Sequence, residues 1–157
     1  TGSMSDIMAL AEFMRYLAPP APTSGPPSPS VVNGSHVFEQ IGCGLCHTRQ
    51  LQTGLSQSAA LSNKPVHLYS DLAIHNMGPG LADRIDQGLA RGGDWRTAPL
   101  WGLGQRIFFL HDGRTKDLVQ AIEQHASPGS EASGVVQNFN ALPQQAAQDL
   151  LNFLRSL

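Results

Sequence analysis

The sequence of 157 residues is poor in aromatic residues, in charge and in cysteine. Aromatic residues make up 6% and charged residues 14%, and cysteine occurs only twice. The formal net charge of -2 gives no basic field that would attract nucleic acid, so nucleic-acid binding is not expected. No run approaches the roughly 18–20 apolar residues of a membrane-spanning helix, so no transmembrane segment is expected either. This number of aromatic side chains is small for a core of this size, which suggests that something other than side chains fills part of the interior.

The first thirty residues differ in composition from the rest of the chain. Residues 1–4 read Thr-Gly-Ser-Met, which is typical of a cloning remnant, and the absence of a signal peptide predicts a mature form or an excised domain. Residues 5–17 are predicted to form a short amphipathic helix, either the end of a preceding domain or a helix that docks onto the main body. Residues 18–30 are predicted to be a proline-rich linker, because six of the eleven positions from 19 to 29 are proline. The main body is expected over residues 31–157.

Helical periodicity is the main secondary-structure signal in this body. Helices are predicted over residues 35–42, 115–126 and 143–156. A short strand over residues 66–72 is a weaker expectation. Residues 75–103 are rich in glycine and interrupted by proline, so long regular elements are not expected there. The predicted fold class is all-α, with long irregular loops.

The two cysteines, Cys43 and Cys46, are separated by two residues and followed at once by His47. A redox-active Cys-x-x-Cys pair usually belongs to a βαβ unit, and no such pattern surrounds this pair. A zinc site would need a second pair of ligands at matching spacing, and the chain has no further cysteine. The favoured interpretation is covalent attachment of haem, for which Cys-x-x-Cys-His is the usual pattern. A buried dithiol is the alternative.

Covalent haem would explain both the cysteine count and the scarcity of aromatic residues. Cys43 and Cys46 would each bond one vinyl group of a single haem c, and His47 would bind the iron as its proximal ligand. The flat macrocycle would then replace several aromatic side chains in an all-α, cytochrome c-like domain. Because bacteria attach haem c outside the cytoplasmic membrane, the protein is expected in the periplasm.

The ligand opposite His47 determines what the iron can do. Two histidines indicate low-potential electron transfer, a His/Met pair indicates transfer at higher potential, and an open position indicates peroxide or small-ligand chemistry. His125 is the favoured ligand, because it follows Leu118 and Ile122 on the apolar face of its predicted helix. Met77 is the alternative, on a loop that could close over the haem. The weaker candidates are the remaining histidines, His36, His67, His75 and His111.

Haem also carries two propionates, which need cationic or hydrogen-bond-donating partners. Arg96 and Arg114 are predicted to bind them, because each lies beside a turn and close to a segment expected to face the haem. Trp101 is expected to donate its indole N–H or to line the pocket. His111 is expected to organise a turn or to contact a propionate. A solvated surface position is the alternative for each arginine.

Several segments outside the Cys-x-x-Cys-His sequence form a wider pattern. The most specific are Trp-Arg-Thr at 95–97 and His-Asp-Gly-Arg at 111–114, and the others cover residues 38–47, 69–72, 75–78, 96–103 and 150–157. Over about residues 37–157 these segments resemble the C-terminal haem domain of the bacterial di-haem oxidoreductases, also called thiol oxidoreductases, of the di-haem cytochrome c peroxidase superfamily. Residues 5–17 resemble the last helix of that family's preceding domain.

The resemblance implies that two histidines bind the iron. In the peroxidases the C-terminal haem takes a methionine from the helix after the His-Asp-Gly-like turn, and here the matching stretch of residues 121–125 ends in His125. The second Cys-x-x-Cys-His and its domain are missing, so the expected partner is a redox protein or that N-terminal haem domain. The sequence therefore predicts a mono-haem c-type domain for single-electron transfer, held by His47 and His125, without enzyme activity of its own. The alternatives are a peroxidase-like module with a labile or absent distal ligand, and a His47/Met77 cytochrome.

Overall fold

The structure, a computed structural model, describes residues 5–21 and 25–157. Its α-helices are α1 (Asp6–Arg15), α2 (Pro29–Gln40), α3 (Leu118–Glu123), α4 (Ser133–Asn140) and α5 (Gln144–Ser156). Two 3-10 helices are η1 (Cys43–Leu45) and η2 (Leu103–Gln105). Two antiparallel sheets pair β1 (Leu51–Gln52) with β2 (Pro65–Val66), and β3 (Ile74–Asn76) with β4 (Asp94–Arg96). The residues of the predicted cloning remnant, 1–4, lie outside the described residues.

The prediction of an all-α fold is wrong. The described chain contains two small sheets as well as helices, and long irregular segments join them. β3 pairs with β4 inside the segment where no long regular element was expected. Strands of two or three residues are too short to show an alternating pattern, so their pairing leaves no periodic signal in the sequence. Of the predicted strand over 66–72, only Val66 lies in a strand, as the last residue of β2.

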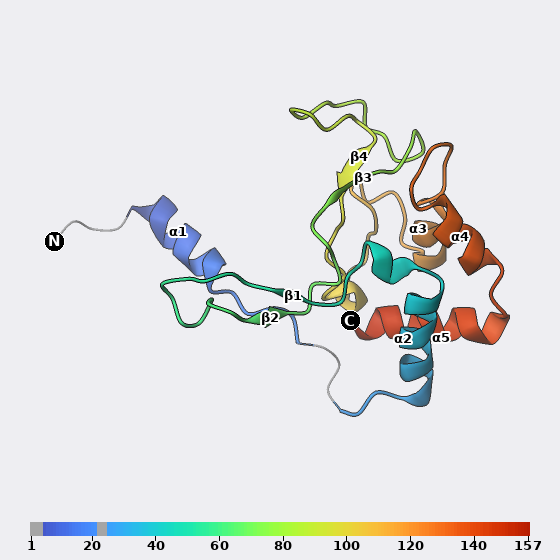
Figure 1. Cartoon of the computed structure of the whole chain (residues 1–157), viewed down its shortest axis with the longest axis horizontal. Helices are drawn as coiled ribbons and strands as arrows, with labels where there is room; N and C mark the ends of the chain where they lie inside the picture. Colours follow the sequence, from blue (N-terminus) through green and yellow to red (C-terminus); the bar gives the residue numbers. More distant parts are fainter. Residues whose placement is uncertain (1–4, 22–24) are drawn as a thin grey trace.

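The hydrophobic core lies where α2 crosses α5 (Figure 1). Phe38 of α2 is 1% exposed, and its ring meets the ring of Phe153 edge-on at 5.4 Å between centroids. Leu150 of α5 is completely buried. The two helices can approach so closely because Gly34 faces the backbone carbonyl of Asp149, where a Cβ atom would overlap the oxygen. This crossing fixes the end of α2, from which the chain enters η1.

The observed helices begin and end at residues that differ in part from the predicted ones. α2 begins inside the predicted linker, because Ser28 caps it by accepting the N–H of Val31 at 3.3 Å and Pro29 occupies its first turn. α5 begins directly after Pro143, as the pattern indicated. α4 was not predicted, since its eight residues bury only Val136 and Phe139. Two apolar contacts in two turns give a weak periodic signal.

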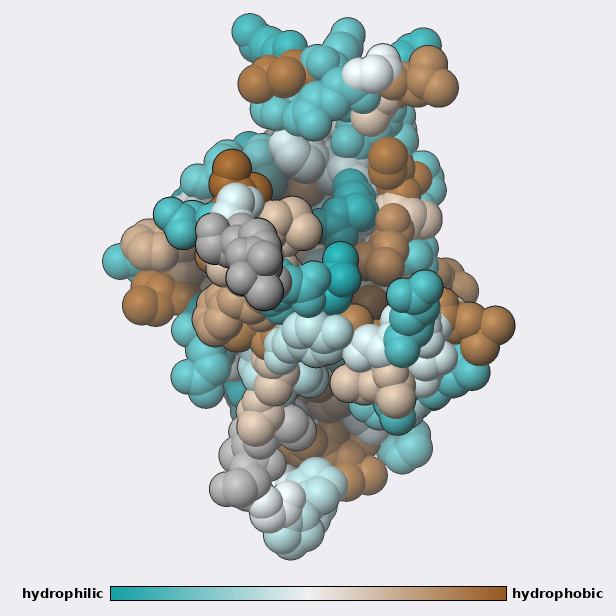
Figure 2. Space-filling model, turned by 90° about the vertical axis from the view of Figure 1, so that its left-hand side faces the viewer, coloured by the Kyte–Doolittle hydropathy of each residue, from teal (hydrophilic) through white to brown (hydrophobic). Residues whose placement is uncertain are grey.

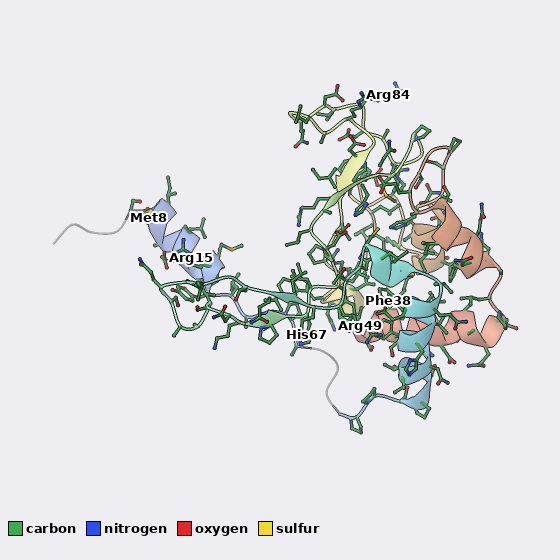
Figure 3. The ribbon with its side chains drawn as sticks, viewed as in Figure 1. Met8, Arg15, Phe38, Arg49, His67 and Arg84 are labelled. Atoms are coloured by element: carbon green, nitrogen blue, oxygen red, sulfur yellow. The ribbon has the colours of Figure 1, made fainter. Side chains whose placement is uncertain are left out.

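Three parts of the chain project from the core (Figure 1): α1, the β1–β2 hairpin and the connection between β3 and β4. α1 buries no residue, and its apolar side chains Ile7 and Phe13 are 80% and 61% exposed. Figure 2, seen from the side of α1, shows hydrophobic patches alternating with hydrophilic ones. Figure 3 shows Arg84 at the outer end of the β3–β4 connection. Among the described helices none has the length and hydropathy that a membrane crossing requires.

The close contact between α2 and α5 leads to a prediction about Gly34. Replacing Gly34 with alanine puts a methyl group into the Asp149 carbonyl, so the helices must separate. We expect a loss of about 3 kcal/mol in the free energy of unfolding, measured by urea titration. Gly134, inside α4, has no atom near its Cβ position, so Gly134→Ala should instead stabilise the protein by about 0.5–1 kcal/mol. Equal effects of the two substitutions would contradict this account of the crossing.

Candidate functional site

The two cysteines lie on a tight turn that α2 delivers. Gly42 adopts a left-handed conformation with φ of 102°, which lets the chain leave α2 and enter η1. The N–H of His47 then donates to the carbonyl of Cys43 at 2.9 Å and closes the turn. Cys43 and Cys46 are both free and partly buried. Burial raises the pKa of Cys43 to about 12, and burial together with the nearby Asp71 and Glu131 raises the pKa of Cys46.

An arginine and a glutamate brace this turn against α2. The Nε–H of Arg49 donates to Glu39 Oε1 at 2.6 Å, and a terminal N–H of the same guanidinium donates to the carbonyl of Ser35 at 2.8 Å. The carboxylate of Glu39 occupies the space where Gly44 would carry a Cβ atom. Figure 3 shows Arg49 close to Phe38, where α2 meets α5. Sequence reasoning missed this pair, because Glu39 and Arg49 are ten positions apart, which does not match the three- or four-residue spacing of helical pairs.

His47 is held so that one particular ring nitrogen is free. Its Nδ1 lies 3.0 Å from the carbonyl oxygen of Tyr69. A carbonyl can only accept, so Nδ1 carries the proton and Nε2 keeps a lone pair. Tyr69 has a φ of 53°, an uncommon left-handed conformation for a residue with a side chain. Burial lowers the pKa of His47 to about 4, so the imidazole is neutral at physiological pH.

The ring of His125 is also bonded through Nδ1 to a backbone carbonyl, although His125 does not lie on a helix. α3 ends at Glu123, so the predicted helix over 115–126 is too long at this end. The backbone N–H of His125 turns to the carbonyl of Ile122 at 3.1 Å, and its Nδ1–H donates to the carbonyl of Ala121 at 2.7 Å. Nε2 is therefore the nitrogen with the lone pair, and burial lowers the pKa of this ring as well. The two rings are close enough that His125 contributes to the lowered pKa of His47.

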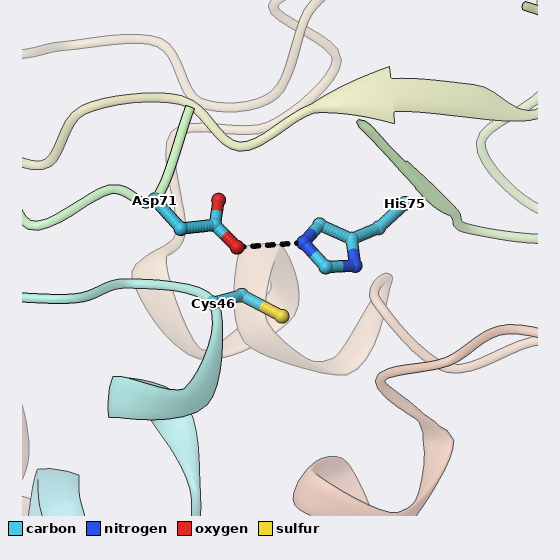
Figure 4. A group of neighbouring side chains, drawn as sticks. All are labelled: Cys46, Asp71 and His75. Atoms are coloured by element: carbon cyan, nitrogen blue, oxygen red, sulfur yellow. Dashed lines mark hydrogen bonds and ion pairs between the residues drawn. The ribbon is translucent and has the colours of Figure 1, made fainter. Parts of the chain in front are cut away.

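His75 differs from these two, because it lies between two carboxylates. Its Nε2 is 2.9 Å from Asp71 Oδ2, and its Nδ1 is 2.8 Å from Glu131 Oε2 (Figure 4 shows the first pair). Both contacts raise the pKa of His75, and those of Asp71 and Glu131 are lowered in turn. Carboxylate oxygens can only accept, so both ring nitrogens carry a proton in this arrangement, and Nε2 has a lone pair only after its proton leaves. Cys46 Sγ completes a group with Asp71 and His75 whose ligand atoms lie within 4.8 Å of one another.

The residues predicted to bind propionates have different surroundings. Arg114 donates from Nε to Asp112 Oδ2 at 2.6 Å and from a terminal nitrogen to the carbonyl of Gly80 at 2.9 Å. Arg96 is exposed on β4, and Trp101 is partly buried shortly after it. His111 is exposed, and its ring stacks on Trp95 at 3.8 Å between centroids. Among the described residues, no hydrogen bond or ring contact joins any of these four residues to His47.

The other residues that the sequence offered as iron ligands lie on loops and exposed surfaces. Met77 is partly buried on the loop after β3, and its carbonyl accepts from Ser127 Oγ at 2.9 Å, which ties this loop to the chain just beyond His125. His36 is exposed on α2, and His67 is exposed at the base of the β1–β2 hairpin (Figure 3). His47 and His125 are the two histidines whose Nδ1 binds a carbonyl and whose pKa is lowered.

Comparison with known proteins gives a family and one structural likeness. Residues 4–157 match the family described as "Di-haem oxidoreductase, putative peroxidase". Among solved structures, the chain is similar to hydrazine synthase of Kuenenia stuttgartiensis, with a TM-score of 0.61 and 18% sequence identity. The likeness covers 96% of this chain and 55% of that one, so the chain spans about half the length of its structural neighbour. None of the curated proteins compared with the chain matches it.

The ion pairs of His75 predict a stability that depends on pH. The pKa of His75 is raised above its ordinary 6.5, so its contribution is complete below pH 6.5 and is lost as the pH rises through the raised value. The pKa values of Asp71 and Glu131 are lowered from 3.8 and 4.5, so their contributions are complete above about pH 4.5 and are lost as the pH falls through the lowered values. The pairs are therefore strongest between about pH 5 and 6.5.

We expect His75→Gln to reduce the free energy of unfolding by about 1 kcal/mol in that window, since both pairs are partly open to water. Urea titrations across the pH range should show the difference from the unmodified protein shrinking toward alkaline pH. His67→Gln, at an exposed position, is the control and should leave the pH profile unchanged. A His75→Gln penalty that does not vary with pH would contradict the ion-pair assignment.

Proposed function

Because the chain belongs to the di-haem oxidoreductase family, we propose that it carries one covalent haem c and passes single electrons through an iron held by His47 and His125. Family membership confirms the resemblance seen in the sequence, and it gives the protein a haem-based redox role. The number of haems, the axial ligands and electron transfer as the specific task are our proposal. The main observation in its support is that the imidazoles of His47 and His125 are both neutral and both keep a lone pair on Nε2.

The donor groups fit such a haem. Each imidazole is neutral, is anchored through Nδ1–H to a backbone carbonyl and keeps the lone pair on Nε2, which is the form of histidine that binds iron. The anchoring carbonyls fix each ring before any metal arrives. Cys43 and Cys46 are free thiols on the turn that ends at His47, as two thioether bonds to one haem require. The cysteine count of two allows no second haem attached in this way.

A haem supplies one-electron chemistry when it is bound, and the protein determines how that chemistry is used. Two neutral imidazoles would be strong ligands and would leave no vacant position for a substrate. Burial around His47 and His125 disfavours protonation, which would otherwise remove a ligand. Single-electron transfer is the function that these residues support best. Met77 remains the alternative to His125, because Ser127 links its loop to the same turn.

The chain has features expected of one half of a two-haem protein. Its family is named for two haems, whereas its two cysteines provide for one. The apolar side chains of α1 are exposed, as expected of a helix that contacts another domain. We therefore propose that the electron partner is a second haem domain that contacts α1. Because bacteria attach haem c outside the cytoplasmic membrane, we also propose that the protein is periplasmic.

Replacing His125 tests the distal ligand. In the haem-loaded protein, His125→Ala should change the oxidised spectrum from low-spin to high-spin and allow cyanide and carbon monoxide to bind, because a coordination position opens. His125→Met restores a ligand at the same position and should remain low-spin, with a higher reduction potential. His67→Ala is the control and should leave the spectrum unchanged. A low-spin spectrum in His125→Ala, lost only when Met77 is also replaced, would assign the ligand to Met77.

The haem count is tested separately by intact mass and by the spectrum of the reduced haem in alkaline pyridine. The protein produced with haem attachment should carry the mass of one haem, and the spectrum should indicate two thioether bonds. Cys43→Ala and Cys46→Ala should each give the spectrum of a haem with one thioether bond, at reduced yield. Haem that separates from the unmodified protein in acid and organic solvent would contradict covalent attachment.

A further inference from the structure

Cys46 belongs to a second group of side chains besides the haem-binding turn. Its Sγ, the Asp71 carboxylate and the His75 imidazole offer ligand atoms within 4.8 Å of one another (Figure 4). Cys46 directly follows η1, Asp71 lies in the loop between β2 and β3, and His75 lies on β3. The backbone N–H of Asp71 donates to the carbonyl of Cys46 at 2.8 Å and so joins two of the three residues. The N–H of Ala73 donates to Asp71 Oδ1 at 2.9 Å and orients the carboxylate.

Glu131 completes this group from the opposite side of His75. Its Oε2 lies 2.8 Å from His75 Nδ1, and its Oε1 accepts the N–H of Asn76 at 2.8 Å. Because Glu131 binds Nδ1–H, the other ring nitrogen, Nε2, points at Asp71. Nε2 can bind a metal once it has lost its proton. Histidines that bind metals commonly have this partner on the second nitrogen, because it fixes the tautomer and raises the basicity of the ligand. The side chains of His75 and Asp71 are 20% and 22% exposed, so solvent reaches the group directly.

We propose that, before haem is attached, the chain binds one zinc ion through Cys46 Sγ, an Asp71 oxygen and His75 Nε2, with Glu131 orienting His75. One thiolate, one imidazole and one carboxylate are ligands that zinc accepts, and three protein ligands leave a fourth position for water. Cys43 takes no part, because the three clustered ligand atoms belong to other residues.

Zinc and haem therefore compete for the same sulfur atom. This consequence rests on the proposed function, whereas zinc binding itself does not. Each thioether forms when a Cys S–H adds across a haem vinyl group, the sulfur bonding to one carbon and the hydrogen to the other. A thioether carries no charge and is a much weaker zinc ligand than a thiolate. Haem attachment at Cys46 thus removes the zinc site, and zinc on Cys46 blocks that thioether.

The test uses the full chain produced without haem and kept reduced. Zinc should bind in a 1:1 ratio, and cobalt should show a charge-transfer band with the intensity of one thiolate. Cys46→Ala, Asp71→Asn and His75→Gln should each weaken zinc binding by more than the ~10–100-fold that loss of an outer partner costs, and Glu131→Gln should weaken it within that range. Cys43→Ala is the matched control, since it removes the other thiol of the same turn, and should bind zinc normally.

The main competing site is the Cys-x-x-Cys-His turn itself, which could bind zinc through Cys43, Cys46 and His47. A cobalt band of two-thiolate intensity, or equal losses in Cys43→Ala and Cys46→Ala with none in His75→Gln, would overturn the proposal. Circular dichroism of each variant without metal checks that it folds, and His75→Ala provides a second substitution if His75→Gln does not. Haem attachment measured without zinc tests the proposed function separately, so the two can fail independently.

Discussion

The packing of α2 across α5 is the constraint on which the Cys-x-x-Cys-His turn depends. Gly34 lets the helices approach, and that approach buries Phe38 against Phe153. The ring of Tyr69 packs edge-on against both phenylalanines, at 6.1 and 5.9 Å between centroids. The carbonyl of Tyr69 in turn binds Nδ1–H of His47. A contact between two helices therefore determines, through Tyr69, which nitrogen of His47 can bind a metal.

Some of this arrangement could be predicted because it depends on residues that are close in the sequence. The Cys-x-x-Cys-His turn needs five consecutive residues, and α5 buries its residues Leu150, Leu151 and Leu154 at helical spacing. The family resemblance rests on equally local segments, and it holds. The all-α prediction failed because helices are the only elements here long enough to leave a periodic pattern. Two sheets with strands of two and three residues leave none.

The surroundings of the histidines could not be predicted in the same way. His125 was expected on the face of a helix, but α3 ends first and the ring caps the carbonyl of Ala121. The exact end of a helix depends on which backbone groups find other partners, and the sequence pattern does not fix it. His75 and Glu131 are 56 positions apart. Only the tertiary fold brings them together, because Glu131 follows α3 while His75 lies on β3.

The same residue type therefore has two opposite chemical states around one turn, since His75 and His125 are both close enough to affect the pKa of His47. A carbonyl on Nδ1 and burial keep His47 and His125 neutral, and two carboxylates make His75 a cation. Neutral rings can bind iron, whereas His75 can bind a metal only if the metal displaces its proton. The metal can displace this proton only if another ligand of the group binds it strongly. Of Cys46 and Asp71, the thiolate of Cys46 is the stronger ligand for zinc. In our proposal haem attachment turns Cys46 into a thioether. The proton on His75 would then have no strong competitor, and the ion pairs with Asp71 and Glu131 would be the lasting state of the cluster.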